Sequence, residues 1–432
     1  MARTSIQNIR ALVKRRIQVV HFFLVRKGWP HWAIAALILT ISVAATPYVD
    51  TYLNFIRVRY WLFQQIAELT ARAIEPRFVT FVAIGDEEFY QGYLARRTPL
   101  RRDYLARIVD ALDAADASVI ALDINMRLEC KKATGAPSRY DELEPYRLET
   151  DVLMRAIARA ADSRHVVLSA TILDGRERDT YRQCPDVYQV YGICSGRDQS
   201  GRWLNPGTPD FPLTLRARSN ISCGYIALPK DMRLLPPRIK MDVGPDLESF
   251  SFAIAYAHKP RIARKVGNNS YYSTYIPTRT IAESNVAFSA SALLRQEPEV
   301  LEAVRDYAVI VGGQWHENGV GLGKLVDMHE TPLGPIVGAV IHQNFVEGIL
   351  DGRLYAHVPK WVLTVLEVLF GILAALVFAA YPSFWTKLIG FLTFSLVLVS
   401  IQWLMLQLFG TFFEAFVPLL GLWLHSILER FL

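Results

Sequence analysis

The stretch from Leu100 to Asn125, LRRDYLARIVDALDAADASVIALDIN, decides the fold prediction. Up to Ala117 it carries apolar residues at steps of three and four, which is the spacing of an amphipathic helix. The remaining residues, SVIALDIN, form an apolar run that ends in polar side chains, as a buried strand does. A helix that leads directly into a buried strand is typical of a parallel α/β sheet.

The same unit recurs on both sides of this stretch. A buried strand is predicted before it at RFVTFVAIGD, and helix-then-strand units follow at TDVLMRAIARAAD with HVVLSATI and at EVLEAVRDYAVIVGG. Strands and helices that alternate in this way pair as neighbours through right-handed crossovers. The predicted fold class is therefore α/β, a mainly parallel sheet covered by helices.

Hydrophobic residues make up 52% of the 432 residues, and the excess over a soluble protein lies near the two ends of the chain. Apolar runs there approach the roughly 20 residues that a helix needs to cross a bilayer. Four transmembrane helices are predicted, one before the α/β domain and three after it, at residues 31–49, 361–381, 388–409 and 412–428.

The net charge of +6 is concentrated in residues 1–30, which contain seven Lys or Arg residues and no acid. Positive charge confined to the stretch before a membrane span indicates anionic lipid on the cytoplasmic side and argues against nucleic acid as a partner. These residues are predicted to form a basic amphipathic arm in the cytoplasm, with a frayed basic tail as the alternative. Residues 31–49 are interpreted as an uncleaved anchor, and a cleaved signal peptide is the alternative.

The charge distribution also predicts the topology. With the basic arm inside, residues 50–357 form an extracytoplasmic domain, and the four spans return the C-terminus to the cytoplasm. All four cysteines fall in this domain, mostly within a Gly-, Pro- and Asp-rich insert at residues 174–223. Their even number outside the cytoplasm predicts one or two disulfides, with all three pairings open, among Cys130, Cys184, Cys194 and Cys223.

Parallel α/β sheets bind ligands beyond the carboxyl ends of their strands. Asp86 and Glu87 follow the first predicted strand, Asp123 lies in the second, and Gln314 follows the last. These four residues are candidate ligand contacts, and Arg102 of the PLRR sequence is a fifth. A carboxylate at a strand end is often only a turn or a helix cap, so both interpretations stay open.

Several histidines suggest metal chemistry near the end of this domain. The glycine-rich VGGQWHENGVGLGK does not match a phosphate-binding loop, because the glycine-to-lysine spacing is one residue short and leucine stands where Ser or Thr would hold magnesium. Imidazole and carboxylate groups suit zinc-like ions, and the candidates are His316, Asp327, His329 and His342. Against a metal, HETPLGP is predicted to be a turn-rich loop, with His342 on the helix that follows it.

Glu367 lies about two turns into the predicted span at residues 361–381. An ionisable group inside a membrane usually marks a partner or a pathway, so Glu367 is a candidate for coupling within the membrane. Close to the outer boundary, its side chain would instead reach water.

The chain resembles the CHASE sensor domain of type two, an extracytoplasmic domain of bacterial receptors. The resemblance covers about Tyr52 to Tyr355 and rests on FVAIGDEEF, TPLRRDYLARIVDALDAADASVIALDI, CGYIALPKDMRLLP, SFSFAIA, and YAVIVGG running into DMHETPLGPIVGAVIHQNFVEGIL. The family typically has one span before the sensor and three after it. The resemblance also implies that the last stretch is a corner that closes the domain, formed by Asp327, Thr331, Pro332, Gly338 and His342.

The chain departs from the family in four respects. Gly85 stands where an acid is usual, a tryptophan common before the P-x-x-R motif is absent, and the cysteine-bearing insert is not expected. Relatives usually continue into a kinase or cyclase, whereas this chain reaches Leu432 a few residues past its last predicted span. A cytoplasmic catalytic domain is therefore not expected.

The function expected from the resemblance is that of a non-enzymatic sensor or accessory subunit in a bacterial inner membrane, with its main domain in the periplasm. It would bind a solute or a protein outside the cytoplasm, without a cofactor, and signal to an envelope or signalling partner through its transmembrane bundle. The resemblance also implies a homodimer. Two alternatives stay open: a periplasmic metal-dependent hydrolase that uses Asp327, His329 and His342, and a structural scaffold of an envelope complex.

Overall fold

Contacts within the computed structural model divide the chain into two units, Trp61–Ala356 and a second unit made of Met1–Tyr60 with His357–Leu432. The structure describes residues 76–97, 100–124, 144–170, 220–228, 234–235, 237–239, 247–266, 271–274, 287–331, 334–352 and 354–356, with scattered positions between 361 and 404. The basic arm, most of the insert, three of the four cysteines and Glu367 lie outside the described residues.

A six-stranded sheet forms the centre of the domain. Its strand order is β4-β3-β2-β10-β1-β9, and every neighbouring pair is parallel. The α/β prediction is thus confirmed, and within the described residues this sheet is parallel throughout. The strands are β1 (Val79–Gly85), β2 (Val119–Asp123), β3 (His165–Ala170), β4 (Ile221–Tyr225), β9 (Ala287–Ser289) and β10 (Ala308–Gln314).

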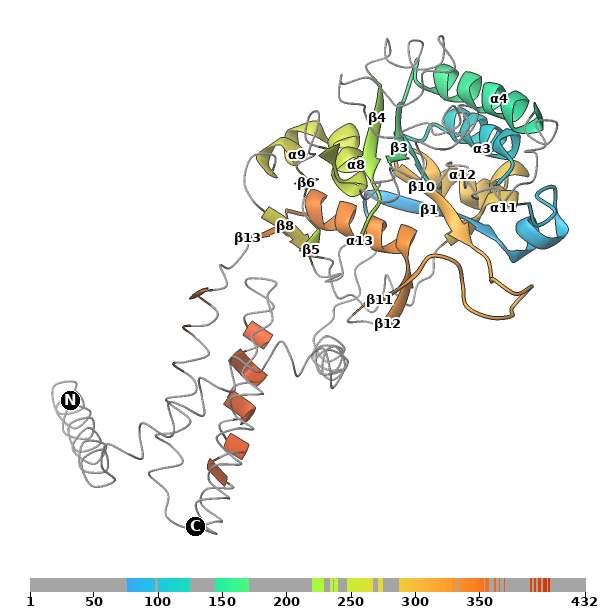
Figure 1. Cartoon of the computed structure of the whole chain (residues 1–432). Coiled ribbons are helices and arrows are strands. Elements are labelled where there is room, and N and C mark those ends of the chain that lie inside the picture. The colour runs from blue at the N-terminus through green and yellow to red at the C-terminus, as the bar shows by residue number, and fades with distance from the viewer. Residues whose placement is uncertain are drawn as a thin grey trace, which may run out of the picture. The chain divides into compact units, whose positions relative to one another are not determined.

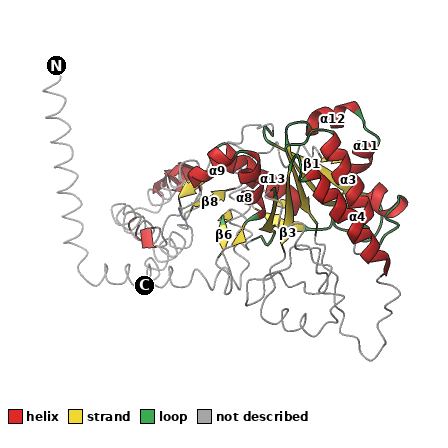
Figure 2. Ribbon diagram, turned by 90° about the horizontal axis from the view of Figure 1, so that it is seen from above, coloured by secondary structure: helices red, strands yellow, loops and turns green. Residues whose placement is uncertain are grey.

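Helices cover both faces of the sheet (Figure 1). The α3 face carries α3 (Arg102–Ala114), α4 (Glu144–Ala160), α11 (Ala290–Leu294) and α12 (Pro298–Val304). The α13 face carries α8 (Phe250–His258), α9 (Pro260–Val266) and α13 (Gly338–Leu350). Figure 2 shows the sheet between these two layers. The predicted amphipathic helix and the strand that follows it are α3 and β2, and the helix is two residues shorter at its start and three residues shorter at its end than predicted.

Side chains alternate between the two layers along each strand, as the pleat of a β-strand requires. In β1, Val82 and Ile84 belong to the core on the α3 face, whereas Phe81 and Ala83 belong to the core on the α13 face. A sheet covered on both sides has no polar face, which explains why its strands read as continuous apolar runs in the sequence.

Short antiparallel pairs complete the domain. The strands β11 (Met328–Thr331) and β12 (Gly334–Val337) form a hairpin in which Thr331 faces Gly334, so part of the predicted turn-rich loop is strand. A second sheet has the order β13-β8-β5, and β6 pairs with β7. These strands are β5 (Leu234–Leu235), β6 (Arg238–Ile239), β7 (Leu247–Glu248), β8 (Tyr271–Thr274) and β13 (Leu354–Ala356).

The connections that follow β1, β10 and β2 create a topological switch point. After β1 the chain passes through the π-helical turn η1 (Glu87–Gln91) into α3, and the helix that follows β2 is α4. Both helices lie on the α3 face. From β10, which lies between these two strands, it continues into α13 on the opposite face. Open α/β sheets bind ligands where neighbouring connections diverge in this way.

Among the described residues, no helix combines the length and apolar character that crossing a bilayer requires. Of the four expected spans, residues 31–49 and 412–428 lie wholly outside the described part of the chain, 361–381 almost wholly, and 388–409 is described only at scattered positions. They stay predictions.

Candidate functional site

Asp123 ends β2 at the switch point. The pleat directs its side chain to the α13 face, because Val119 and Ala121 of the same strand belong to that core. Its Oδ2 atom is buried and has no hydrogen-bond partner. Burial, together with the negative charge of Asp327, raises the pKa of Asp123 to about 8.

Asp327 lies against the first residue of α13. A Cβ on residue 338 would overlap the Asp327 carboxylate, so only glycine leaves room for the carboxylate beside the helix start. The amide of Gly338 donates to the Asp327 carbonyl at 2.9 Å, and Asp327 has a positive φ of 56°. The carboxylate therefore lies beside the amino end of α13, where a helix carries a positive partial charge. His329 Nε2 and Asp327 Oδ1 lie 2.9 Å apart and add a second contact.

His342 is a core residue of α13. Its side chain is 1% exposed, its Nδ1 lies 2.9 Å from Ser251 Oγ of α8, and its ring meets Phe250 edge-on. Burial lowers the pKa of His342 to about 4, so the imidazole is neutral at neutral pH. Within the described residues, no three His, Cys, Asp or Glu side chains are grouped so as to hold a metal ion.

Asp86 holds the glycine-rich loop after β10. Its carboxylate accepts hydrogen bonds from the amides of His316 and Gly321, at 2.6 and 2.9 Å, and lies 2.7 Å from His316 Nδ1. Burial alone would raise the pKa of Asp86, but these contacts outweigh it and hold the pKa below its ordinary value. The Gly321 amide is therefore engaged by a carboxylate of the chain itself, which fits the absence of a phosphate-loop motif.

Sequence reasoning selected Glu87 and missed its neighbour Glu88. Glu87 is exposed, whereas Glu88 is buried and accepts hydrogen bonds from the Gly85 amide, Ser289 Oγ and the Ser291 amide. Burial opposes ionisation of Glu88, but these donors outweigh it and lower its pKa. Glu88 thereby ties β1 to β9 and the start of α11. Nothing in the sequence distinguishes two adjacent glutamates, because a π-helical turn decides which one faces inward.

Gln314 ends β10 beside Gly85 of β1 and is half-buried. It points to the α13 face by the pleat, since Gly312 two residues earlier approaches Ala339 of α13 and Phe81. Its side-chain amide makes no hydrogen bond to any described residue. Gln314 and Asp123 therefore share one face of the carboxyl edge.

Arg102 lies in the joint between α3 and α4. Its side chain is 1% exposed, its Nη1 donates to Thr150 Oγ1, and its amide donates to Glu149 Oε2 at 3.2 Å. The structure therefore places this ligand candidate between α3 and α4, whereas the side chain of Asp123 points to the α13 face.

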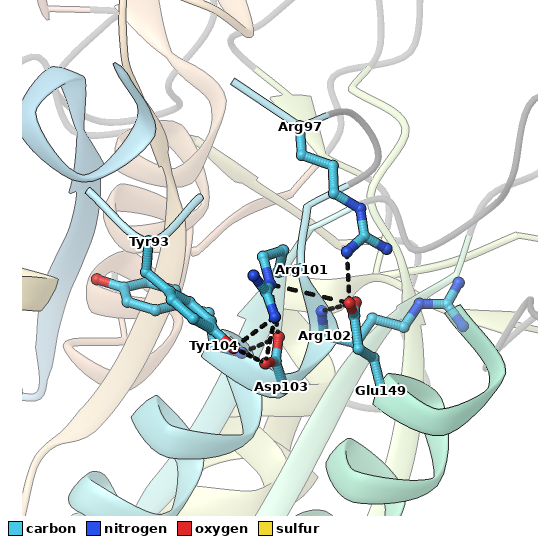
Figure 3. A network of polar contacts seen from close by, with 7 residues as sticks. All are labelled: Tyr93, Arg97, Arg101, Arg102, Asp103, Tyr104 and Glu149. Carbon is cyan, nitrogen blue, oxygen red and sulfur yellow. Dashed lines mark hydrogen bonds and ion pairs between the residues drawn. The ribbon is translucent and has the colours of Figure 1, made fainter. Parts of the chain in front are cut away.

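The same joint carries a wider network of polar contacts around Glu149 (Figure 3). Glu149 pairs with Arg97 and lies 3.8 Å from Arg101 Nε. The Arg101 guanidinium lies 3.7 Å from the centre of the Tyr93 ring and pairs with Asp103. These contacts fix the segment between η1 and α3 on the second turn of α4.

Glu347 lies at the opposite, amino edge of the sheet and was not selected from the sequence. It is 1% exposed, and its Oε1 accepts hydrogen bonds from the amides of Arg77, Phe78 and Val79 at 3.0, 2.8 and 2.8 Å. Its Oε2 is buried without a partner, and burial raises the pKa of Glu347. The sequence did carry one indication of this role, because Glu347 is an acid within the apolar run FVEGIL of a predicted helix.

A family model of the CHASE2 domain matches residues 26–380 of this chain. The chain belongs to the CHASE2 family. CHASE2 domains are sensory domains, and the family is not known as a catalytic one. No curated protein and no solved structure matches the chain. The match to the family model confirms the resemblance that the quoted motifs indicated.

The predicted disulfides remain a prediction. Of the four cysteines, the described part of the chain contains Cys223, which lies in β4 opposite Leu168 and packs against the core of the α3 face.

Proposed function

We propose that this CHASE2 protein is a membrane-anchored sensor that binds a solute outside the cytoplasm at the switch point and signals to a membrane partner. Three features support the proposal: membership of a sensory family, polar groups gathered at the carboxyl edge, and α13, which links that edge to the opposite one. No enzymatic step is proposed.

The observation that carries the proposal is the placement of the two ends of α13. Its start contacts Asp327 and β10 at the carboxyl edge, through Gly338 and through Ala339 beside Gly312. Near its end, Glu347 binds the backbone of Arg77–Val79, where the chain enters the domain. Thirteen helical residues span about 20 Å, which is enough to reach from one edge of the sheet to the other.

This arrangement suits signal transmission because both chain connections meet at one place. Residues before Arg77 lead toward the first predicted span, and residues after α13 lead through β13 toward the second. A ligand that binds better to one position of α13 shifts its population, and a differential affinity of ~1–3 kcal/mol suffices for a useful coupling. Spans 31–49, 361–381, 388–409 and 412–428 would carry the signal laterally, with Glu367 as a contact for the partner.

Amide hydrogen exchange on the full chain in lipid nanodiscs tests the proposal. The sample is compared with and without a low-molecular-mass extract of the bacterial envelope. We expect slower exchange at Gln314–His316 and, through α13, at Arg77–Val79, because local opening at both edges depends on the same helix. Protection at the carboxyl edge alone would mean binding without transmission and would contradict a sensor role.

A variant separates transmission from binding. Glu347→Ala removes the acceptor of three amides and leaves the carboxyl edge intact, so it should keep the protection at Gln314–His316 and lose the response at Arg77–Val79. Asp151→Asn, an exposed position on α4, is the matched control and should respond as the wild type does. If no extract changes exchange at either edge, the solute-binding proposal fails and the scaffold alternative is favoured.

A further inference from the structure

A carboxylate at the switch point lacks the partner that buried acceptors normally have. Neither oxygen of Asp123 accepts a hydrogen bond from a described residue, and Oδ2 is buried. Because the residue as a whole is only partly covered, Oδ1 is the oxygen that solvent reaches. Most buried acceptors in proteins are satisfied, so this one is available to a donor that the described residues do not supply.

The charges around Asp123 favour a cationic donor. The charge of the exposed Asp327 carboxylate acts on Asp123 and raises its pKa further. His342 is neutral and bonded to Ser251, and His329 is engaged with Asp327. Among the described residues, no Lys or Arg compensates Asp123. At neutral pH a neutral ligand would leave Asp123 protonated beside the charged Asp327, whereas a cation would stabilise the ionised form of Asp123 and offset the repulsion between the two carboxylates.

Gln314 supplies a third acceptor on the same face. Asp123 pairs with Gly312, so Gln314 lies two residues further along the neighbouring strand, with a Cα–Cα distance of about 8 Å. Its amide makes no hydrogen bond to the described residues, and its carbonyl oxygen is an acceptor.

We infer that Asp123, Asp327 and Gln314 bind the primary ammonium group of a small organic cation. This inference rests on the proposed function and names the chemical class of its solute. Three acceptors match the three N–H donors of an ammonium group, as they would those of a lysine side chain. A metal ion fits less well because it needs four or more ligands, and the described residues contain no group of three His, Cys, Asp or Glu for it.

Calorimetric titration of the full chain in lipid nanodiscs tests the inference. The probes are ethylammonium and 1,4-butanediammonium, and their N-permethylated forms serve as controls that keep the charge but lack N–H donors. We expect a primary ammonium to bind at least about tenfold more tightly than its permethylated form. Titration at pH 7 in two buffers of different protonation enthalpy should show proton release, because neutral Asp123 must ionise to pair with the cation.

Two variants make the site assignment specific. Asp123→Asn should weaken ammonium binding about 10- to 100-fold and abolish the proton release, since a charge-assisted contact is lost. Gln314→Ala should weaken binding about fivefold and keep the proton release. Asp151→Asn, which makes the same chemical change on exposed α4, should bind as the wild type does.

The inference is overturned if neither primary ammonium binds, if the permethylated forms bind equally well, or if Asp123→Asn leaves the affinity unchanged. These results differ from failure of the sensor proposal. If the envelope extract still protects both edges while the ammonium probes do not bind, the solute belongs to another chemical class and the sensor role stands.

Discussion

Two buried acids at opposite edges of the sheet show how the surroundings of a residue set its role. Glu347 has a raised pKa, yet its Oε1 accepts hydrogen bonds from three backbone amides, so its role is to hold the start of β1 against α13. Asp123 also has a raised pKa but contacts no donor among the described residues. A buried group that costs stability and makes no contact is a candidate for binding, because function commonly retains such a group.

Asp123→Asn should remove a pH dependence of stability. Below about pH 3.8, Asp123 is protonated in both the folded and the unfolded state, so ionisation of this acid does not reduce the free energy of unfolding. As the pH rises to about 8, the unfolded state ionises first and the folded state loses stability. Asn at position 123 does not titrate, so near pH 8 the free energy of unfolding of the variant should exceed that of the wild type by about 1–3 kcal/mol. The difference is no larger because partial contact with solvent reduces the cost of ionising Asp123.

Melting temperatures of the two proteins, measured from about pH 4 to about pH 8, check this prediction. The two curves should converge at acid pH and separate progressively above it. Parallel curves would mean that Asp123 has an ordinary pKa, and they would weaken the case for an unpartnered carboxylate.

Replacing Glu347 should loosen the start of β1. Glu347→Ala leaves three amides without their acceptor, of which the Val79 amide belongs to a fully buried residue, and we expect a local loss of about 2–3 kcal/mol. Glu347→Gln keeps a carbonyl acceptor and should cost less than about 1 kcal/mol. Exchange rates of the Arg77–Val79 amides measure both effects. Equal rates in the two variants would show that the hydrogen bonds contribute nothing.

At the scale of elements, α13 is the part of the fold on which the site depends. It packs closely on β10 because Gly312 has no side chain; a Cβ there would come within 2.9 Å of the Ala339 Cβ. It begins at Gly338 because the Asp327 carboxylate occupies the space of a side chain. Two glycines in different elements thus set the position of the helix start relative to Asp123.

Gly338→Ala should displace either Asp327 or the first turn of α13, at a cost of about 1–3 kcal/mol. The double variant Asp327→Gly with Gly338→Ala removes the overlapping carboxylate and should recover most of the loss. Glycine at 327 also suits its positive φ of 56°. Thermal unfolding of the wild type, both single variants and the double variant gives the coupling energy. Additive losses would show that the overlap with Asp327 is not the cause.

The elements could be predicted from the sequence to different extents. Helix α3 and strands β1, β2, β3 and β10 were predictable because long apolar runs and a 3.6-residue period identify buried elements regardless of context. The β11–β12 hairpin was not, since HETPLGP combines Pro and Gly with few apolar residues. Asp123 was selected because it is a polar residue at the end of a predicted strand. That its carboxyl group has no hydrogen-bond donor among the described residues could not be predicted, because this depends on which connections surround it. Glu88 was missed because its inward direction depends on the π-helical turn η1.

At the scale of the whole molecule, the fold brings both chain connections to one edge and the candidate site to the other. In the proposed mechanism a signal would have to cross the sheet, and α13 contacts both edges. The proposed route requires the domain to lie outside the cytoplasm, on the same side as its solute, while the basic residues of 1–30 remain inside. This topology is predicted from the charge distribution and the apolar runs, and the prediction can be tested independently of any ligand.

Fusions of alkaline phosphatase test the topology, because this enzyme is active only where its disulfides form, outside the cytoplasm. A fusion after Gly352, at the end of α13, should be active, and a fusion after Leu432 should be inactive. A green fluorescent reporter after Leu432 should fluoresce and thereby show that the inactive fusion is present. Neutralising the seven basic residues of 1–30 should lower the activity of the Gly352 fusion, because the positive charges hold the arm inside. Activity at Leu432 with none at Gly352 would invert the topology, and the switch point would then face cytoplasmic solutes.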